Sequence, residues 1–319
     1  MPRHGVGFKS GDKEDGLTIV AACQPSECLR QFLPRNLWGR NGHPGTGLLP
    51  CSAGKKAPNS GRPISPSEAA LIPNPILKVL SSMATHQVQC LLIGGQACVF
   101  YGAAEFSRDS DFAILAEPAN LARLKEALAE LQAPVIAVPP FETAYLERGH
   151  AIHFRCQHPE CAGLRVDVMS KMRGVDSFDQ LWDRRTTLEL ADGSECNLLA
   201  VPDLVKAKKT QCDKDWPMIR RLMEAHHFEF REDVTPERLD FWLLELRTAD
   251  LLIELANNQP EPVRRCVSQR PLLQQAIHGQ VEPLERALLE EELTERAADR
   301  QYWLPLKREL KALRRTRIS

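Results

Sequence analysis

A glycine pair followed by two closely spaced aspartates constrains the fold of this chain more than any other feature. Residues 91–115 read LLIGGQACVFYGAAEFSRDSDFAIL, so Gly94 and Gly95 end one apolar run, and Asp109 and Asp111 begin the next. Aspartate is a poor strand former, and glycine loses more backbone entropy on folding than any other residue. Departures from local propensity that fall this close together are typical of a functional or strained site.

Apolar periodicity around this stretch predicts strands that alternate with helices. Residues 88–95 fit a buried strand closed by the glycines, residues 96–103 a short helix, and residues 110–116 a second strand. The same periodicity predicts a helix at 117–133, strands at 134–138, 151–157 and 163–170, a hairpin at 186–201, and helices at 201–212 and 214–228. These elements indicate an α+β fold in which helices flank a mixed sheet.

The remainder of the chain reads as almost entirely helical. One helix is expected over 235–258, and further helix boundaries are expected at Pro260, Pro271, Pro283 and Pro305. We therefore predict an α+β domain at 66–215 and a helical C-terminal domain at 216–319, about two domains for 319 residues.

Residues 1–65 differ in composition from the rest of the chain. They hold 10 of the 18 glycines together with seven prolines, and nine Lys or Arg against four Asp or Glu. Such a composition predicts a disordered, Gly/Pro-rich basic tail. Two alternatives are sequence upstream of the true start and a tail that contacts nucleic acid.

Composition excludes some classes of protein. The formal net charge is −1, and no apolar run approaches the roughly 20 residues of a membrane span. The ten cysteines are scattered over a chain that is too large to need disulfides. We expect a cytoplasmic protein with no membrane partner.

The acidic residues have the spacing of a metal site. Residues i and i+2 of a strand face the same side, so Asp109 and Asp111 would present two like charges that a cation must offset. A third acid, Asp167, interrupts the apolar alternation of LRVDVMS. Three clustered carboxylates suit two Mg²⁺ ions and phosphoryl transfer, and a glycine pair at a helix start lets phosphates approach the backbone.

These motifs, in this order, resemble the polymerase-beta-type nucleotidyltransferase superfamily. The similarity is greatest to its small bacterial branch, the minimal and abortive-infection toxin-type nucleotidyltransferases, and it extends into VPDLVKAKKTQCDKDWPMI at 201–219. The resemblance implies that Gly94 and Gly95 bind the nucleotide phosphates. It also implies that Asp109 and Asp111 hold two Mg²⁺, and that Asp167 completes the metal site and helps to activate the acceptor hydroxyl.

Other residues near the motifs have more open roles. The resemblance implies that Lys208 approaches the triphosphate or the adenine, and that Lys214 and Asp215 brace their helix. Ser107 fits either a phosphate contact or a strand-edge hydroxyl, and Arg108 fits either a phosphate contact or an offset to the carboxylate charge. Ser110 departs from the small apolar residue common between the two aspartates of the family.

The resemblance implies a metal-dependent enzyme that transfers a nucleoside monophosphate from ATP or another NTP to an acceptor hydroxyl, releasing pyrophosphate. Acceptors left open include a tRNA 3′ end and a protein hydroxyl. The first alternative is a non-catalytic nucleotide-binding module, or one that pairs with an antitoxin. The second is a zinc-binding hairpin built on Cys156 and Cys161 with neighbouring histidines.

Overall fold

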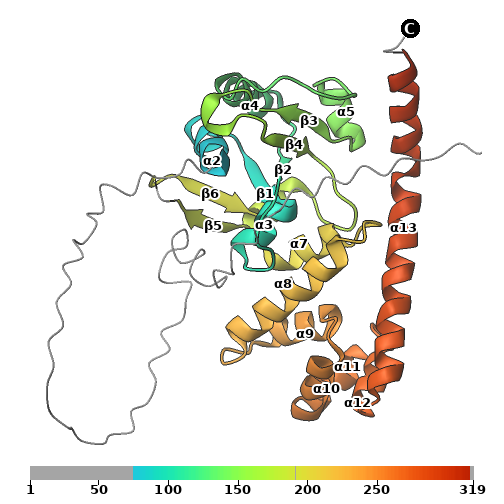
Figure 1. The fold of residues 1–319 in the computed structure, drawn as a ribbon. Helices are drawn as coiled ribbons and strands as arrows, with labels where there is room; N and C mark the ends of the chain where they lie inside the picture. Colours follow the sequence, from blue (N-terminus) through green and yellow to red (C-terminus); the bar gives the residue numbers. More distant parts are fainter. Residues whose placement is uncertain (1–74, 191, 317–319) are drawn as a thin grey trace, which may run out of the picture.

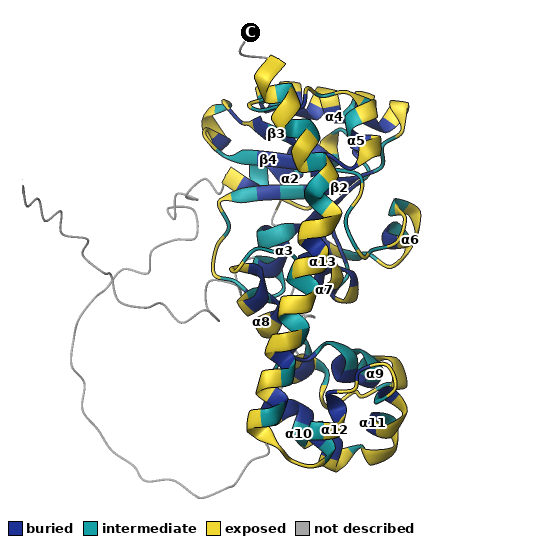
Figure 2. Cartoon of the chain, turned by 90° about the vertical axis from the view of Figure 1, so that its right-hand side faces the viewer, coloured by how far each residue is buried: buried dark blue, intermediate teal, exposed yellow. Residues whose placement is uncertain are grey.

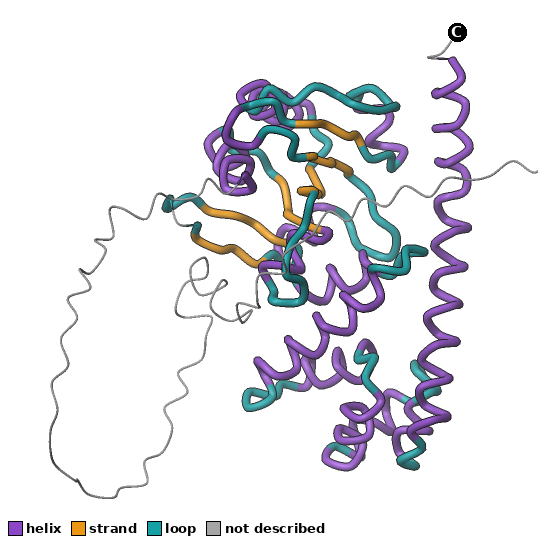
Figure 3. The backbone as a smooth tube through the Cα atoms, in the orientation of Figure 1, coloured by secondary structure: helices purple, strands orange, loops and turns teal. Residues whose placement is uncertain are grey.

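A computed structural model describes residues 75–190 and 192–316 of the chain, so the predicted tail at 1–65 lies outside the described residues. Six strands form one mixed sheet in the order β3-β4-β2-β1-β6-β5 (Figures 1 and 3). They are β1 (Cys90–Ile93), β2 (Asp109–Ile114), β3 (Ile152–Arg155), β4 (Arg165–Met169), β5 (Thr186–Glu189) and β6 (Glu195–Leu198). Strand β2 pairs antiparallel with β1 and parallel with β4, and β1 also pairs parallel with β6. The predicted α+β class with a mixed sheet is confirmed.

Helices pack around this sheet as their apolar spacing requires. They are α2 (Pro75–Thr85), α3 (Gly94–Phe100), α4 (Pro118–Glu130), α5 (Thr143–Arg148), α6 (Phe178–Asp183), α7 (Val201–Lys208) and α8 (Asp215–Phe230), with a 3₁₀ turn, η1, at Pro159–Cys161. Helix α4 starts with Pro118 in its first turn and buries Leu121, Leu124 and Leu128 on one face. Helix α3 connects β1 to the segment before β2, and the pairing of Ile93 with Asp111 places the end of β1 beside the start of β2.

The C-terminal region consists of helices and ends in a long one. After α9 (Pro236–Glu245), α10 (Ala249–Asn258), α11 (Pro260–Cys266) and α12 (Leu273–Ile277), helix α13 runs for 36 residues, Val281–Thr316. Its first turns pack on α10 and α12, and the rest extends alongside the sheet-bearing part (Figures 1 and 2). The far end is tied to α5, because Glu309 pairs with Arg148 and His150.

Three sequence predictions were wrong. Residues 134–138 form no strand; only Val135 makes an isolated bridge to Phe154, since the flanking Pro134 and Pro139 lack N–H donors. The helix predicted over 235–258 is interrupted at Leu246, whose extended backbone (ψ 140°) separates α9 from α10 while its side chain stays fully buried. Pro305 does not end a helix but lies inside α13, at the loss of one backbone hydrogen bond.

A continuous cluster of buried side chains extends from Ile76 to Leu288 and includes residues of the sheet and of the C-terminal helices. The division into domains at residues 215 and 216 therefore stays a prediction. Within the described residues, no helix combines the length and the apolar character needed to cross a membrane.

Candidate active site

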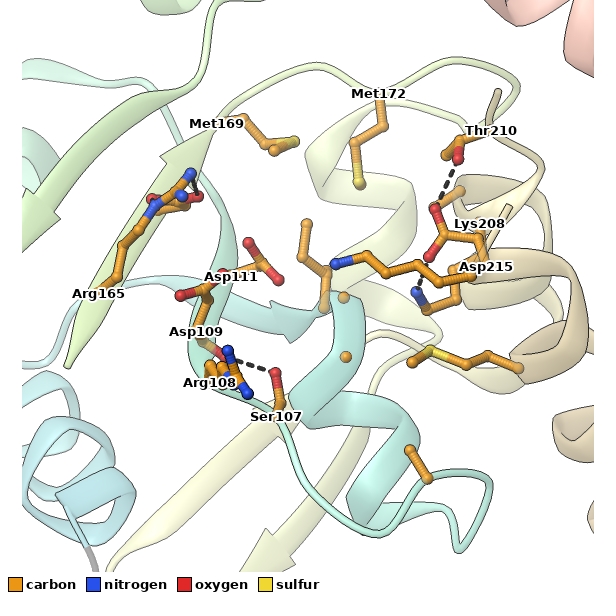
Figure 4. A pocket seen from close by; sticks show the side chains of 18 of the residues that line it. Ser107, Arg108, Asp109, Asp111, Arg165, Met169, Met172, Lys208, Thr210 and Asp215 are labelled. Carbon is orange, nitrogen blue, oxygen red and sulfur yellow. Dashed lines mark hydrogen bonds and ion pairs between the residues drawn. The ribbon is translucent and has the colours of Figure 1, made fainter. Parts of the chain in front are cut away.

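The three predicted acids lie on one face of the sheet, at neighbouring positions of two parallel strands. In the β2–β4 register, Asp111 pairs with Asp167 and Asp109 pairs with Arg165. Side chains of paired residues in parallel strands point the same way, and Asp109 and Asp111 are two residues apart. Ser110 and Phe112 point to the opposite, buried face. Figure 4 shows Asp109 and Asp111 side by side at the edge of the pocket.

Gly94 is required at its position because Asp111 occupies the space that a side chain would need. A Cβ on Gly94 would lie 2.0 Å from Asp111 Oδ2, and its φ of +67° is in the left-handed region that favours glycine. A Cβ on Gly95 would lie 2.8 Å from Ser107 Oγ, which in turn donates to the Asp109 carbonyl oxygen. The glycine pair thus lets the start of α3 contact the acidic strand directly.

The carboxylates of Asp109 and Asp111 are left without partners in the part of the chain that the structure describes. Neither makes a hydrogen bond or ion pair with any other side chain that the structure describes at 75–190 and 192–316. Burial raises the pKa of Asp111 to about 6, and the charges of Asp167 and Asp109 add to this while Lys208 opposes it. Two carboxylates on one face with no ion-pair partner in the described chain, that of Asp111 partly buried, are suited to a hard divalent cation such as Mg²⁺.

Asp167, by contrast, is already paired. Arg165 Nε and Nη2 donate to its two oxygens at 2.8 and 2.5 Å, and His153 Nδ1 lies 2.9 Å from Oδ1. Burial raises the pKa of Asp167, but the hydrogen bonds from His153 and Arg165 outweigh it, so the pKa is lowered overall. Among the residues described, no group of three or more His, Cys, Asp or Glu side chains is arranged to hold a metal ion. Asp167 becomes available as a third ligand only if its contact with Arg165 opens.

Lys208 reaches the same pocket from α7. Its side chain is buried, its Nζ donates to Asp215 Oδ1 at 2.7 Å, and Thr210 Oγ1 donates to the other oxygen of Asp215 at 2.6 Å. Burial lowers the pKa of Lys208, but Asp215 and the more distant Asp111 raise it above its usual range, so the ammonium stays charged. A fixed cation beside the acidic strand suits an anionic ligand.

One cavity of about 860 Å³ collects all of these groups. All eight predicted site residues line it: Gly94, Gly95, Ser107, Arg108, Asp109, Asp111, Asp167 and Lys208. Its other walls include Phe106, Met169, Met172, Arg173, Asp299 and Trp303. The volume is typical of a pocket for a ligand of nucleotide size.

Sequence reasoning missed two parts of this site. Arg165 was detectable, because it stands two residues before Asp167 and so shares its strand face. Asp299 and Trp303 come from α13, more than 80 residues after Lys208, and no local pattern links them to the motifs.

The zinc-hairpin alternative is not supported by the described residues. Cys156 and Cys161 are both buried, His158 accepts a hydrogen bond from the Glu160 backbone, and His153 is engaged with Asp167. Comparison with known proteins adds no assignment: no protein-family model matches the chain, and no curated protein sequence matches it.

Proposed function

We propose that the chain is an Mg²⁺-dependent nucleotidyltransferase of the polymerase-beta type, moving a nucleoside monophosphate from an NTP to an acceptor hydroxyl with release of pyrophosphate. The observation that carries the proposal is the close approach of Gly94 to Asp111, on a sheet face where the carboxylates of Asp109 and Asp111 have no hydrogen-bond or ion-pair partner among the described residues. A scaffold gains nothing from two unpaired carboxylates packed against a backbone, whereas a site for cations and phosphates needs both features.

In this proposal, Asp109 and Asp111 would hold Mg²⁺, with Asp167 as the third ligand. Bound magnesium would neutralise charge on the triphosphate and on the leaving pyrophosphate. Gly94 and Gly95 leave room for phosphate oxygens beside the strand, and Lys208 supplies a positive charge on the opposite wall. Once its contact with Arg165 opens, Asp167 would also help to activate the acceptor hydroxyl.

The test is transfer from labelled NTPs. The protein would be incubated with each α-³²P-NTP, Mg²⁺, and either total RNA or a protein lysate, and the labelled product identified. The double change Asp109→Asn/Asp111→Asn should reduce labelling by about 10²–10³-fold or more, by analogy with the loss of charge-stabilising groups in other enzymes. The matched control is Asp183→Asn, an exposed aspartate at the end of α6. Equal labelling by the wild type and the double variant would refute the proposal.

The contact between Arg165 and Asp167 favours a second candidate function, nucleotide binding without catalysis. A carboxylate neutralised by arginine is typical of a structural pair, and a nucleotide-binding module without catalysis would retain the fold and the phosphate pocket. Such a module would bind NTP with Mg²⁺, as measured by calorimetry, yet label nothing in the transfer assay.

A further inference from the structure

A buried carboxylate on α13, that of Asp299, is bonded to the loop beside the proposed nucleotide site. Asp299 is 1 % exposed, and it is the only buried residue of the described part of α13 beyond Leu288. Its Oδ2 accepts from the backbone N of Gln211 at 2.9 Å and from Gln211 Nε2 at 3.2 Å. Its Oδ1 accepts from Trp303 Nε1 at 2.9 Å and pairs with Arg173 Nε at 3.3 Å.

The buried carboxylate of Asp299 needs an explanation other than helix packing. Burying a carboxylate costs free energy that an apolar residue would not, so helix packing alone does not explain Asp299. A carboxylate can instead accept a backbone N–H from a segment without regular structure and so fix that segment. Residues 209–214, between α7 and α8, form such a segment, and Arg173 Nη2 also donates to the Lys209 carbonyl oxygen at 2.6 Å.

The same segment, 209–214, is also bonded to the partner of Lys208 in the pocket. Thr210, next to Gln211, donates through Oγ1 to Asp215 Oδ2 at 2.6 Å, and its carbonyl oxygen accepts from Trp216 Nε1 at 2.9 Å. Asp215 in turn accepts from Lys208 Nζ at 2.7 Å. Asp299 is therefore connected to Lys208 by its hydrogen bonds to Gln211, by the peptide bond from Gln211 to Thr210, and by the hydrogen bonds of Thr210 and Lys208 to Asp215.

We propose that Asp299 is a positioning residue of the nucleotide site: through the 209–214 segment it orients Lys208 toward the phosphates of a bound nucleoside triphosphate. This makes α13 part of the site rather than a separate appendage. The inference rests on the proposed function, because it takes the ligand of Lys208 to be a polyphosphate.

The test measures whether Asp299 acts through Lys208. Binding of inorganic tripolyphosphate with Mg²⁺ would be measured by calorimetry for the full-length wild type, Asp299→Asn, Lys208→Met and the double variant, with titrations carried to millimolar ligand. Asp299→Asn should weaken binding about tenfold, as is usual when a partner that orients a ligating group is lost. In the Lys208→Met background the same change should alter the dissociation constant less than twofold, since the group it orients is gone.

Two further variants separate positioning from folding. Thr210→Val breaks the link to Asp215 without touching the buried acid, and it should reproduce both the weakening and its dependence on Lys208. Glu290→Gln, at an exposed carboxylate on α13, should bind as the wild type does. Circular dichroism of each variant checks that it is folded. If Asp299→Asn is not folded, the positioning role is tested by Thr210→Val measured with and without Lys208→Met.

The outcomes are distinct. Weakening of equal size with and without Lys208, or folded Asp299→Asn and Thr210→Val proteins that bind normally, would refute the positioning role while leaving the nucleotide site intact. If the wild type binds neither tripolyphosphate nor any NTP, the proposed function itself is refuted, and this inference with it.

Discussion

Gly94→Ala is the substitution for which the structure makes the sharpest expectation. Two costs add. The backbone at φ +67° costs an alanine about 1–2 kcal/mol. The new Cβ would also lie 2.0 Å from Asp111 Oδ2 and 2.9 Å from Asp111 Cβ, so rotation of the carboxylate alone does not relieve the overlap. Overpacking of this kind costs about 1–3 kcal/mol, and we expect a total loss of about 2–5 kcal/mol in the free energy of unfolding.

A second glycine provides the matched control. Gly102 has a similar φ of +73°, but a Cβ there would meet nothing within 4 Å. Gly102→Ala should therefore show only the backbone cost of about 1–2 kcal/mol. Urea unfolding of both variants at pH 7.5, followed by circular dichroism, measures the difference. If Gly94→Ala is no more destabilising than Gly102→Ala, then Gly94 does not closely approach Asp111, and the main support for the proposed site is lost.

Three other substitutions test buried or half-buried ionisable groups. Arg165→Gln should leave Asp167 buried without its guanidinium, lowering stability by about 2–4 kcal/mol, and Mg²⁺ should restore more of the melting temperature than it adds to the wild type. Glu291→Gln removes the bidentate partner of the buried Arg270 and should cost about 3–5 kcal/mol in a urea titration. Burial lowers the pKa of His226 to about 4, so the contribution of the neutral imidazole to stability should be full above pH 6.5 and should fall as the pH drops toward 4. His226→Gln should reduce this loss of stability in acid by up to about 2 kcal/mol. An unchanged dependence of stability on pH in the variant would contradict this expectation.

The sequence predicted the sheet face of the site better than the pocket around it. Strand periodicity suffices to orient Asp109 and Asp111, and alternation in LRVDVMS suffices for Asp167, because side-chain direction in a strand depends only on local spacing. The partners of these side chains depend on tertiary packing. The contact of Asp167 with His153, for example, follows from the register of β3 against β4, which local sequence does not determine.

The errors in the fold have the same origin. Residues 134–138 are apolar enough for a strand, yet prolines at both ends restrict their pairing to one bridge. Leu246 lies in a strongly helical pattern, but burying its side chain outweighs continuing the helix. Pro305 normally ends a helix, but the contact of Glu309 with His150 holds the last turns of α13 in place.

Asp111 itself differs from the other buried charges of the fold. Asp203 pairs with Arg184, Asp215 with Lys208, and Asp167 with Arg165, whereas Asp111 makes no ion pair within the described chain. The charge of Lys208 only partly offsets the burial of Asp111 and the charge of Asp167. The cation-free protein should therefore be less stable than it would be with a neutral residue there. With its pKa raised from 3.8 to about 6, the ionised carboxylate costs up to about 3 kcal/mol, or about 1–2 after allowing for its partial exposure.

We accordingly expect Asp111→Asn to raise the free energy of unfolding by about 1–2 kcal/mol at pH 7.5 in chelator, an unusual direction for a change at a polar site. Added Mg²⁺ should stabilise the wild type, by about 2.7 kcal/mol at a hundred times its dissociation constant, and should have little effect on Asp111→Asn. In urea unfolding, Asp111→Asn should therefore be more stable than the wild type without Mg²⁺ and less stable than the wild type at saturating Mg²⁺. A protein in which Asp111 served only the fold would lose stability on this substitution at every Mg²⁺ concentration, and that result would mean that no cation site exists on this face of the sheet.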